Sequence, residues 1–301
     1  DFDKGEQAVK DGGTDYLPTP YINPKNPKQV DAEYEQFKDI APFLGFTSKT
    51  KSGLAGLISR KPIDTENIQP QLEYLIDNAN GGRLNLNQHV NRTVNDVILK
   101  ARFGLLTELP FSDGEMSKQD NANGMMPKII GFKPQNIINW AIKNGELILV
   151  VLREQVEKTI DDQSLFGSEM IYQYRVLLME DGVYKQRLYS ENATGQEFDS
   201  IDVTFDGKSY DYIPFDFVGA QNNDEQCDDS IMYNIVTANK NHYYNAALDQ
   251  NAVTVASMGL LAISGKIRDP DTEYPNGITY GARQGYFFPE GTEIKFVQSA
   301  E

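Results

Sequence analysis

The sequence predicts an α+β fold, because helical and strand-like patterns occupy different stretches of the chain. Helical patterns cover residues 31–41, 48–59, 85–103 and 230–256. Short runs of β-branched and aromatic residues begin near residue 128, and turn signals such as Asp181-Gly182 separate them. Aromatic residues make up 11% of the chain, which favours half-buried β-surfaces on which a ring with a polar tip can pack.

The helical pattern over residues 85–103 is the clearest of the four. Its apolar positions recur at spacings of three and four and therefore share one face: Leu86, Val90, Val94, Val97 and Ala101. Gly104 is expected to end this helix, and a strand is expected to follow through Leu105 and Leu106. The earlier helical segment, residues 48–59, carries Leu54, Leu57 and Ile58 on one side and ends before Pro62.

The strand predictions rest on short runs bounded by turns. The runs cover residues 129–132, 146–153, 172–179, 183–189 and 201–205. Asn144-Gly145 precedes one of them, and Asp181-Gly182 lies directly between two. An Asp-Gly pair in that position is typical of a tight hairpin. After residue 259 the chain returns to short strands around a turn rich in Pro and Gly.

Residues 1–30 are polar and carry four prolines, which predicts an extended arm that lies on other protein. The helix over residues 230–256 has a different character. Asp228, Asp229 and Ser230 offer a cap at its start, but Tyr and Asn residues interrupt any apolar stripe. We expect such a helix to pack beside copies of itself rather than within the core of one monomer.

Composition excludes several classes of protein. The net charge of −16, from 44 acids and 28 bases, repels phosphate and argues against sequence-reading DNA binding. A surface past which DNA slides without sticking remains compatible with that charge. The single cysteine, Cys227, excludes an intrachain disulfide and a thiolate metal cluster within one chain. The longest aliphatic run, residues 147–152, is far too short to span a bilayer, so no membrane partner is expected.

A search for catalytic chemistry finds no candidate. Neither His89 nor His242 has a second histidine at helical spacing, so both are expected to be surface or interface residues. Cys227 lies among carboxylates, which disfavour a thiolate. Gly265-Lys266-Ile267 lacks the hydroxyl residue and the earlier glycine of a phosphate-binding loop. The chain is therefore expected not to be an enzyme and to hold no cofactor.

One acidic turn has a partial likeness to a calcium loop. Asp269, Asp271 and Glu273 alternate as ligands do, but Tyr274 and Tyr280 stand where such loops place Gly and Glu. A solvated turn is the preferred interpretation, and no metal ligand is predicted.

Several segments, in this order, resemble bacteriophage portal proteins of a portal-like family found in tailed phages and prophages. They are Thr47 to Pro62, Ala101 to Pro110, Pro134 to Trp140 with the following LILVVLRE, Tyr174 to Leu177, Ile213 to Val218, and Phe287 to Gly291. The asparagine–aliphatic–asparagine–tryptophan motif that ends at Trp140 is the most specific. Thr107-Glu108 departs from the more usual aliphatic-Asp pair.

This resemblance implies one subunit of a ring, usually a dodecamer, through which DNA enters and leaves the capsid. It implies a wing of helices and short antiparallel strands over residues 31–228, a stem helix over 229–257 and a small β-containing clip over 258–301. The returning stem helix and the crown of the family are absent from this sequence. The implied location is the capsid vertex of the virion, after assembly in the host cytoplasm.

The resemblance also implies partners. These are the terminase large subunit, the head-tail adaptor, the major capsid and scaffolding proteins, and non-specific double-stranded DNA in the channel. Lys266, Arg268 and Arg283 of the expected clip are candidates for contact with DNA or partner carboxylates, although solvated surface is the preferred interpretation. Two other functions remain open: another virion structural or connector protein, and a virion hydrolase that uses two carboxylates.

Overall fold

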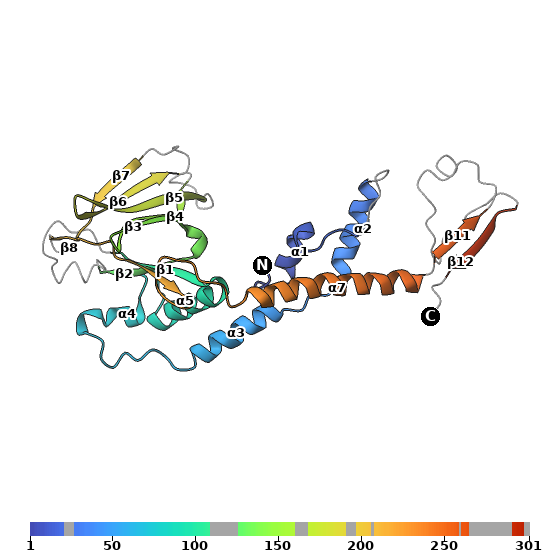
Figure 1. Cartoon of the computed structure of the whole chain (residues 1–301), viewed down its shortest axis with the longest axis horizontal. Helices are drawn as coiled ribbons and strands as arrows, with labels where there is room; N and C mark the ends of the chain where they lie inside the picture. Colours follow the sequence, from blue (N-terminus) through green and yellow to red (C-terminus); the bar gives the residue numbers. More distant parts are fainter. Residues whose placement is uncertain are drawn as a thin grey trace. The chain divides into compact units, whose positions relative to one another are not determined.

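The computed structural model describes residues 1–20, 27–108, 126–159, 168–190, 197–205, 208–258, 260–264 and 291–297 (Figure 1). The chain forms two compact units. The first combines Asp1–Ser48 with Ile235–Glu301, and the second is Lys49–Asn234. Helices and antiparallel sheets are both present, which confirms the α+β class.

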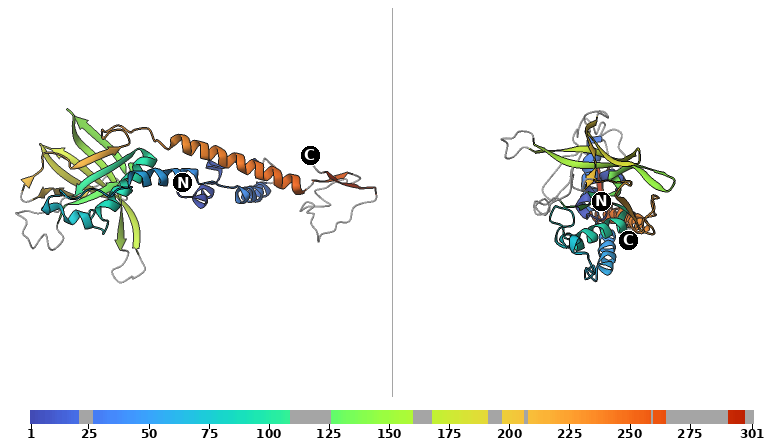
Figure 2. Two further views of the ribbon diagram at one scale, coloured as in Figure 1. Left: turned by 90° about the horizontal axis from the view of Figure 1, so that it is seen from below. Right: turned by 90° about the vertical axis from the view of Figure 1, so that its left-hand side faces the viewer.

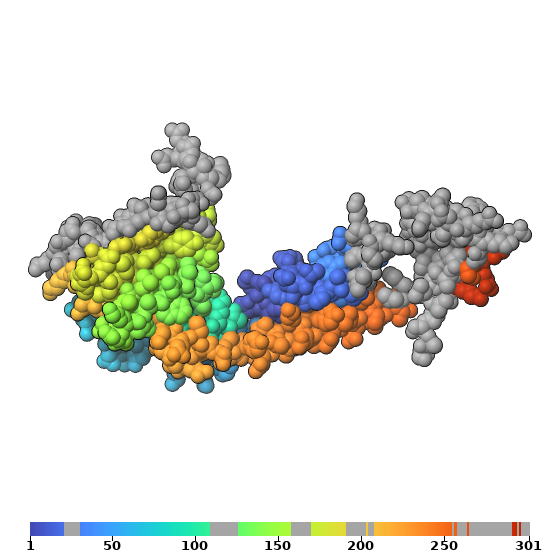
Figure 3. Space-filling model, turned by 45° about the horizontal axis from the view of Figure 1, so that its top comes forward, coloured from blue at the N-terminus to red at the C-terminus, as the bar shows by residue number. Residues whose placement is uncertain are grey.

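The first unit is built around the long helix α7, Tyr233–Met258, which confirms the helix predicted from residue 230. Its other elements are α1 (Glu6–Asp11), the 3-10 turn η1 (Gly13–Asp15), α2 (Pro27–Ile40) and the paired strands β11 (Leu260–Ser264) and β12 (Glu293–Val297). Residues 1–20 and α2 lie against α7 (Figure 3). Their shared core contains Phe2, Val9, Leu17, Phe37, Ala41, Tyr243 and Ala247.

Two expectations about this unit are corrected. Residues 1–20 do not form an extended arm, because Phe2, Val9 and Leu17 bury their side chains and order α1 and η1 around them. The second correction concerns α7, which contributes to the core of its own chain. Tyr243 and Ala247 are four residues apart and therefore share the face that packs on this N-terminal segment.

The second unit has three layers: a five-stranded sheet, a three-stranded sheet and a helix (Figures 1 and 2). The five-stranded sheet runs β3-β4-β5-β6-β7, with bounds Ile137–Lys143, Glu146–Thr159, Ser168–Glu180, Val183–Ser190 and Glu197–Asp202. The three-stranded sheet runs β10-β1-β2, with bounds Phe215–Gly219, Arg102–Glu108 and Lys128–Phe132. Apolar side chains from both sheets form one core, including Leu106, Val150, Leu177 and Phe215.

The second unit also contains smaller elements, of which β8 and β9 pair with each other. They are α3 (Phe46–Ile58, which begins in the first unit), η2 (Pro70–Leu72), α4 (Tyr74–Asp77), η3 (Pro134–Asn136), β8 (Thr204–Phe205) and β9 (Lys208–Ser209). The hairpin predicted at Asp181-Gly182 is confirmed, since it joins β5 to β6 with positive φ at both turn residues. Asn144-Gly145 makes a similar turn between β3 and β4.

Helix α5, Leu86–Lys100, begins with a capping box in which Asn85 and Gln88 exchange hydrogen bonds. It ends earlier than the sequence predicts. Ala101 adopts the left-handed conformation at φ 59° and caps the helix, and Arg102 already belongs to β1. Gly104, the expected end of the helix, lies within the strand. A Cβ there would meet the Phe215 ring at 2.5 Å, so packing rather than capping requires this glycine.

The buried face of α5 is also not the apolar face of the sequence pattern. His89, Thr93 and Ile98 are the buried residues of this helix, whereas Val90 is 38% exposed. His89 lies against the three-stranded sheet, where a Cβ on Gly131 would approach its ring at 3.2 Å. Much of the apolar stripe of α5 is therefore left outside the core of the chain.

Candidate interaction sites

The residues predicted to contact DNA or a partner, Lys266, Arg268 and Arg283, lie outside the described residues, as does the acidic turn from Asp269. Within the described ranges, no cluster of His, Cys, Asp and Glu could hold a metal ion. Among those same residues, no helix combines the length and apolar composition needed to cross a bilayer. The sites that the structure does describe are a clamp around Arg102, an ion-pair cluster around Arg175 and a groove beside α5.

Arg102 forms the centre of the clamp. It is 3% exposed, and its guanidinium carbon lies 5.3 Å from the centre of the Trp140 ring and 4.6 Å from that of Phe217. Both distances are in the range of cation–π attraction. Its Nη2 donates hydrogen bonds to the backbone carbonyls of Asp224, at 3.2 Å, and of Gln226. One buried cation therefore ties the two sheets to the acidic loop that leads into α7.

Further contacts fix this acidic loop, residues 220–230. The Ser230 hydroxyl donates to the carbonyl of Leu99 in α5, at 2.8 Å, and the backbone N–H of Gln221 donates to Asp228 at 2.9 Å. Met232 is fully buried directly after the loop. Its neighbours are not: Ile231 is 54% exposed and Tyr233 is 70% exposed. The segment directly after the loop thus presents two large exposed side chains, Ile231 and Tyr233, from an anchored backbone.

Arg175 of β5 links the two sheets through an ion-pair cluster. Its Nη1 lies 2.8 Å from a carboxylate oxygen of Glu108 in β1, and its Nε lies 2.8 Å from one of Glu154 in β4. Burial acts to lower the pKa of Arg175, but the attraction of Glu154 and Glu108 outweighs it and raises that pKa above its usual value. One guanidinium therefore balances two carboxylates at a largely buried site.

The histidines and the cysteine differ in their surroundings. His89 is buried, which corrects the expectation of a surface or interface residue, and burial together with the nearby charge of Arg92 lowers its pKa. His242 is exposed and stacks edge-on against Phe46, with ring centres 5.4 Å apart. Cys227 is exposed in the acidic loop.

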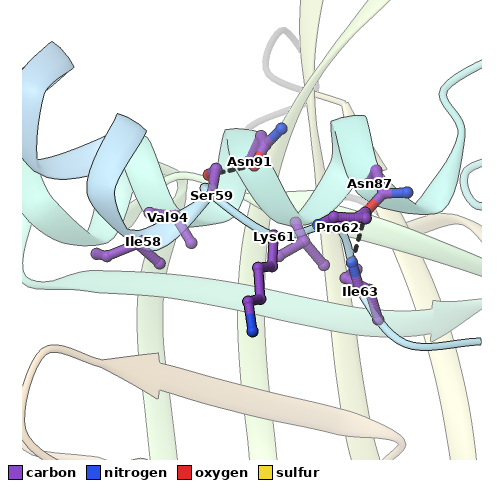
Figure 4. A pocket seen from close by; sticks show the side chains of 9 residues that line it. Ile58, Ser59, Lys61, Pro62, Ile63, Asn87, Asn91 and Val94 are labelled. Atoms are coloured by element: carbon purple, nitrogen blue, oxygen red, sulfur yellow. Dashed lines mark hydrogen bonds between the residues drawn. The ribbon is translucent and has the colours of Figure 1, made fainter.

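A groove of about 380 Å³ lies between the end of α3 and the first half of α5 (Figure 4). It is lined by Ile58, Ser59, Lys61, Pro62, Ile63, Asn87, Val90, Asn91 and Val94. The Ser59 hydroxyl donates to Asn91 Oδ1, and the backbone N–H of Ile63 donates to Asn87 Oδ1 at 3.0 Å. These two bonds hold the segment after α3 along α5 and leave the apolar side chains open to solvent.

The groove is apolar inside and basic beside it. Ile58 is 61% exposed and contributes to its lining together with Val90 and Val94, which belong to the apolar stripe predicted from the sequence. Arg60 and Lys61 are exposed, and no described carboxylate pairs with either. In Figure 4 the Lys61 side chain extends away from the α5 ribbon. A basic, apolar surface of this kind is unusual on a chain with a net charge of −16.

Sequence patterns indicated parts of these sites but not their assembly. The stripe on α5 was visible in the sequence, and Arg102 and Trp140 belong to two of the family-like segments. Nothing local showed that Arg102 would be buried between Trp140 and Phe217, because the three residues come from separate strands. The exposure of Ile231 and Tyr233 likewise depends on the burial of Met232 between them.

Comparisons with known proteins give little further information. No protein-family model matches the chain, and no curated protein matches it. Among solved structures, the chain is similar to a chain in the neck of an empty GTA particle computed with C6 symmetry. The two chains share 11% sequence identity with a TM-score of 0.35, over 98% of this chain and 67% of the other.

Proposed function

We propose that this chain is a structural subunit of a phage portal, a ring at the capsid vertex through which DNA is packaged and ejected. In this proposal the chain is not an enzyme and holds no cofactor. Its partners are further copies of itself, the terminase large subunit, the head-tail adaptor, the capsid and scaffolding proteins, and double-stranded DNA in the channel.

The observation that supports this function best is the convergence of the family-like segments. Ala101 to Pro110, Pro134 to Trp140 and Ile213 to Val218 lie far apart in the sequence. Arg102, Trp140 and Phe217, one residue from each segment, form the clamp, and Arg102 also binds the acidic loop. Residues that resemble a family and also pack together are better evidence of a shared architecture than scattered matches.

Charge is consistent with the same role. A net charge of −16 repels phosphate, so DNA can move past such a subunit without being held.

Electron microscopy of the purified chain tests the proposal. We expect closed rings with an axial hole. We also expect sedimentation velocity to give a single species whose mass matches the number of subunits seen in the rings. Particles that are uniformly monomeric or trimeric at micromolar concentration would contradict the portal function. A ring with no affinity for the terminase large subunit would instead favour another connector of the virion.

A further inference from the structure

We propose that Ile231 and Tyr233 of one copy of the chain dock into the groove beside α5 of a second copy. In that contact, the acidic loop before Ile231 faces Arg60 and Lys61 at the edge of the groove. This inference names the contact between neighbouring subunits, and it rests on the proposed function of the chain as a ring subunit.

The groove supplies the acceptor surface. Helix α5 uses His89, Thr93 and Ile98 to pack on its own sheet and leaves Val90 and Val94 to line the groove. An amphipathic helix whose apolar stripe lies outside its own core is typical of a protein interface. Ile58, which is 61% exposed at the end of α3, adds a third apolar side chain to this lining.

Ile231 and Tyr233 supply the inserting surface. Both are large and exposed, and the buried Met232 between them holds the backbone in place. The Ser230–Leu99 hydrogen bond fixes the same segment from the other side. Little conformational entropy is therefore lost when these side chains are buried, and tyrosine is among the residues that contribute most at interfaces.

Charge complementarity selects a second copy as the occupant. Lys61 lines the groove and Arg60 precedes it in the chain. The inserting segment carries Asp228 and Asp229 within three residues of Ile231. On a chain with 44 acids, like-charge repulsion opposes most contacts between copies. This pair of surfaces is one at which opposite charges and exposed apolar side chains coincide.

The proposed contact joins two different surfaces of the same unit. An interface of unlike surfaces is heterologous, so it leads to a closed ring or to an open filament and not to a two-fold dimer. Each copy then uses its groove for one neighbour and its Ile231–Tyr233 segment for the other. This is the type of contact that a ring of many subunits requires.

Disulfide trapping in the full chain tests the inference directly. Cys227→Ser removes the native thiol, and Val90→Cys and Asn234→Cys are then added together or separately, so that Ile231 and Tyr233 stay in place. With both cysteines in one chain, we expect mild oxidation to give a ladder of disulfide-linked oligomers. A mixture of the two single-cysteine chains should give dimers only, and neither single variant alone should form more than traces. Oxidation of the double variant that leaves monomers would overturn the inference.

Charge reversal provides an independent test. Lys61→Glu and Asp229→Lys are each expected to weaken association measured by sedimentation velocity, and the double variant should recover most of it. Tyr233→Ser should weaken association by about thirtyfold, as expected for an interface hot spot. Met170→Ser, at another exposed apolar side chain, is the matched control and should leave association unchanged. A double charge variant that associates no better than the single variants would argue against the contact.

The outcomes separate this inference from the proposed function. Rings of the wild-type chain, together with no cross-link between residues 90 and 234 in the cysteine variant, would refute the contact and leave the ring intact. Cross-linked open filaments without rings would support the contact and contradict the portal function. A chain that is monomeric and gives no cross-link would refute both.

Discussion

The guanidinium carbon of Arg102 lies 4.6 Å from the centre of the Phe217 ring, at the point where the sheets of the second unit meet the acidic loop. Arg102 begins β1 and Phe217 lies in β10, the strand beside it. The Arg102 side chain thus contacts rings from β3 and β10 and donates hydrogen bonds to the carbonyls of Asp224 and Gln226. Arg102 therefore connects the packing of these strands to the position of the loop before α7.

Arg102→Ala is therefore expected to loosen the acidic loop. The substitution removes two charge-assisted hydrogen bonds and the stacking on two rings, at a cost of about 2–4 kcal/mol in the free energy of unfolding. Hydrogen exchange at residues 221–232 should rise, and urea denaturation should show the loss of stability. Lys143→Ala, at an exposed cation on β3, is the control and should change neither. Unaltered exchange in the loop of the Arg102 variant would show that the clamp does not hold it.

The cluster of Arg175 with Glu108 and Glu154 allows a second prediction. Arg175→Met leaves two largely buried carboxylates without their cation and is expected to cost about 3–5 kcal/mol in unfolding free energy. Replacing Glu108 and Glu154 by Met in the same chain should restore most of that loss, because the charges then disappear together. Urea denaturation of the single and triple variants makes the comparison. A triple variant less stable than Arg175→Met would contradict this prediction. It would show that the two glutamates stabilise the fold through contacts other than their ion pairs with Arg175.

Local patterns were sufficient for much of the fold but not for the sites. The helices near residues 31–41 and 48–59 follow from periodicity, and the Asp181-Gly182 hairpin follows from turn chemistry. The face that α5 buries could not be predicted, because adjacent positions such as His89 and Val90 both fit a helix. The choice between them depends on the fit of α5 against β1 and β2, which is a long-range contact.

The same reasoning explains the error over residues 1–20. Their prolines and polar residues indicated an extended arm, whereas a few apolar residues such as Phe2 and Leu17 decide the structure by packing on α7. The average composition of the segment is polar, so it does not show that a few scattered apolar residues can fix its structure. Burial of a few large side chains nevertheless contributes about 1.5–3 kcal/mol each, which is enough to order a short segment.

The buried His89 predicts a dependence of stability on pH. Burial lowers the pKa of His89 in the folded chain below its ordinary value of 6.5, so the unfolded chain binds a proton that the folded chain does not. Stability is then fully present above pH 6.5 and falls as the pH drops below it, by up to about 1.4 kcal/mol per pH unit until the folded histidine also protonates.

His89→Gln is the variant that isolates this effect. The unfolding free energies of wild type and variant are measured between pH 5 and pH 8. As the pH falls, the wild type should lose stability relative to the variant. Because the carboxylates titrate alike in both proteins, their contribution cancels in the difference. A difference that stays constant over this range would mean that His89 does not change its protonation on unfolding.

Tyr243 of α7 offers a test in which the ring and its hydroxyl can be separated. The side chain is 1% exposed, it stacks edge-on against Phe43 with ring centres 5.8 Å apart, and burial raises the pKa of its hydroxyl to about 12. Among the described residues, that hydroxyl has no hydrogen-bond partner. A buried donor without a partner is costly, so Tyr243→Phe should leave the chain as stable as before or raise its unfolding free energy by up to about 1 kcal/mol.

Tyr243→Ala, in contrast, removes the ring from the core with Phe2 and Phe37 and should cost about 3–5 kcal/mol. Thermal and urea denaturation of the two variants, with hydrogen exchange of residues 1–20 as a local measure, gives the comparison. A Phe variant as unstable as the Ala variant would place the contribution in the hydroxyl instead of the ring.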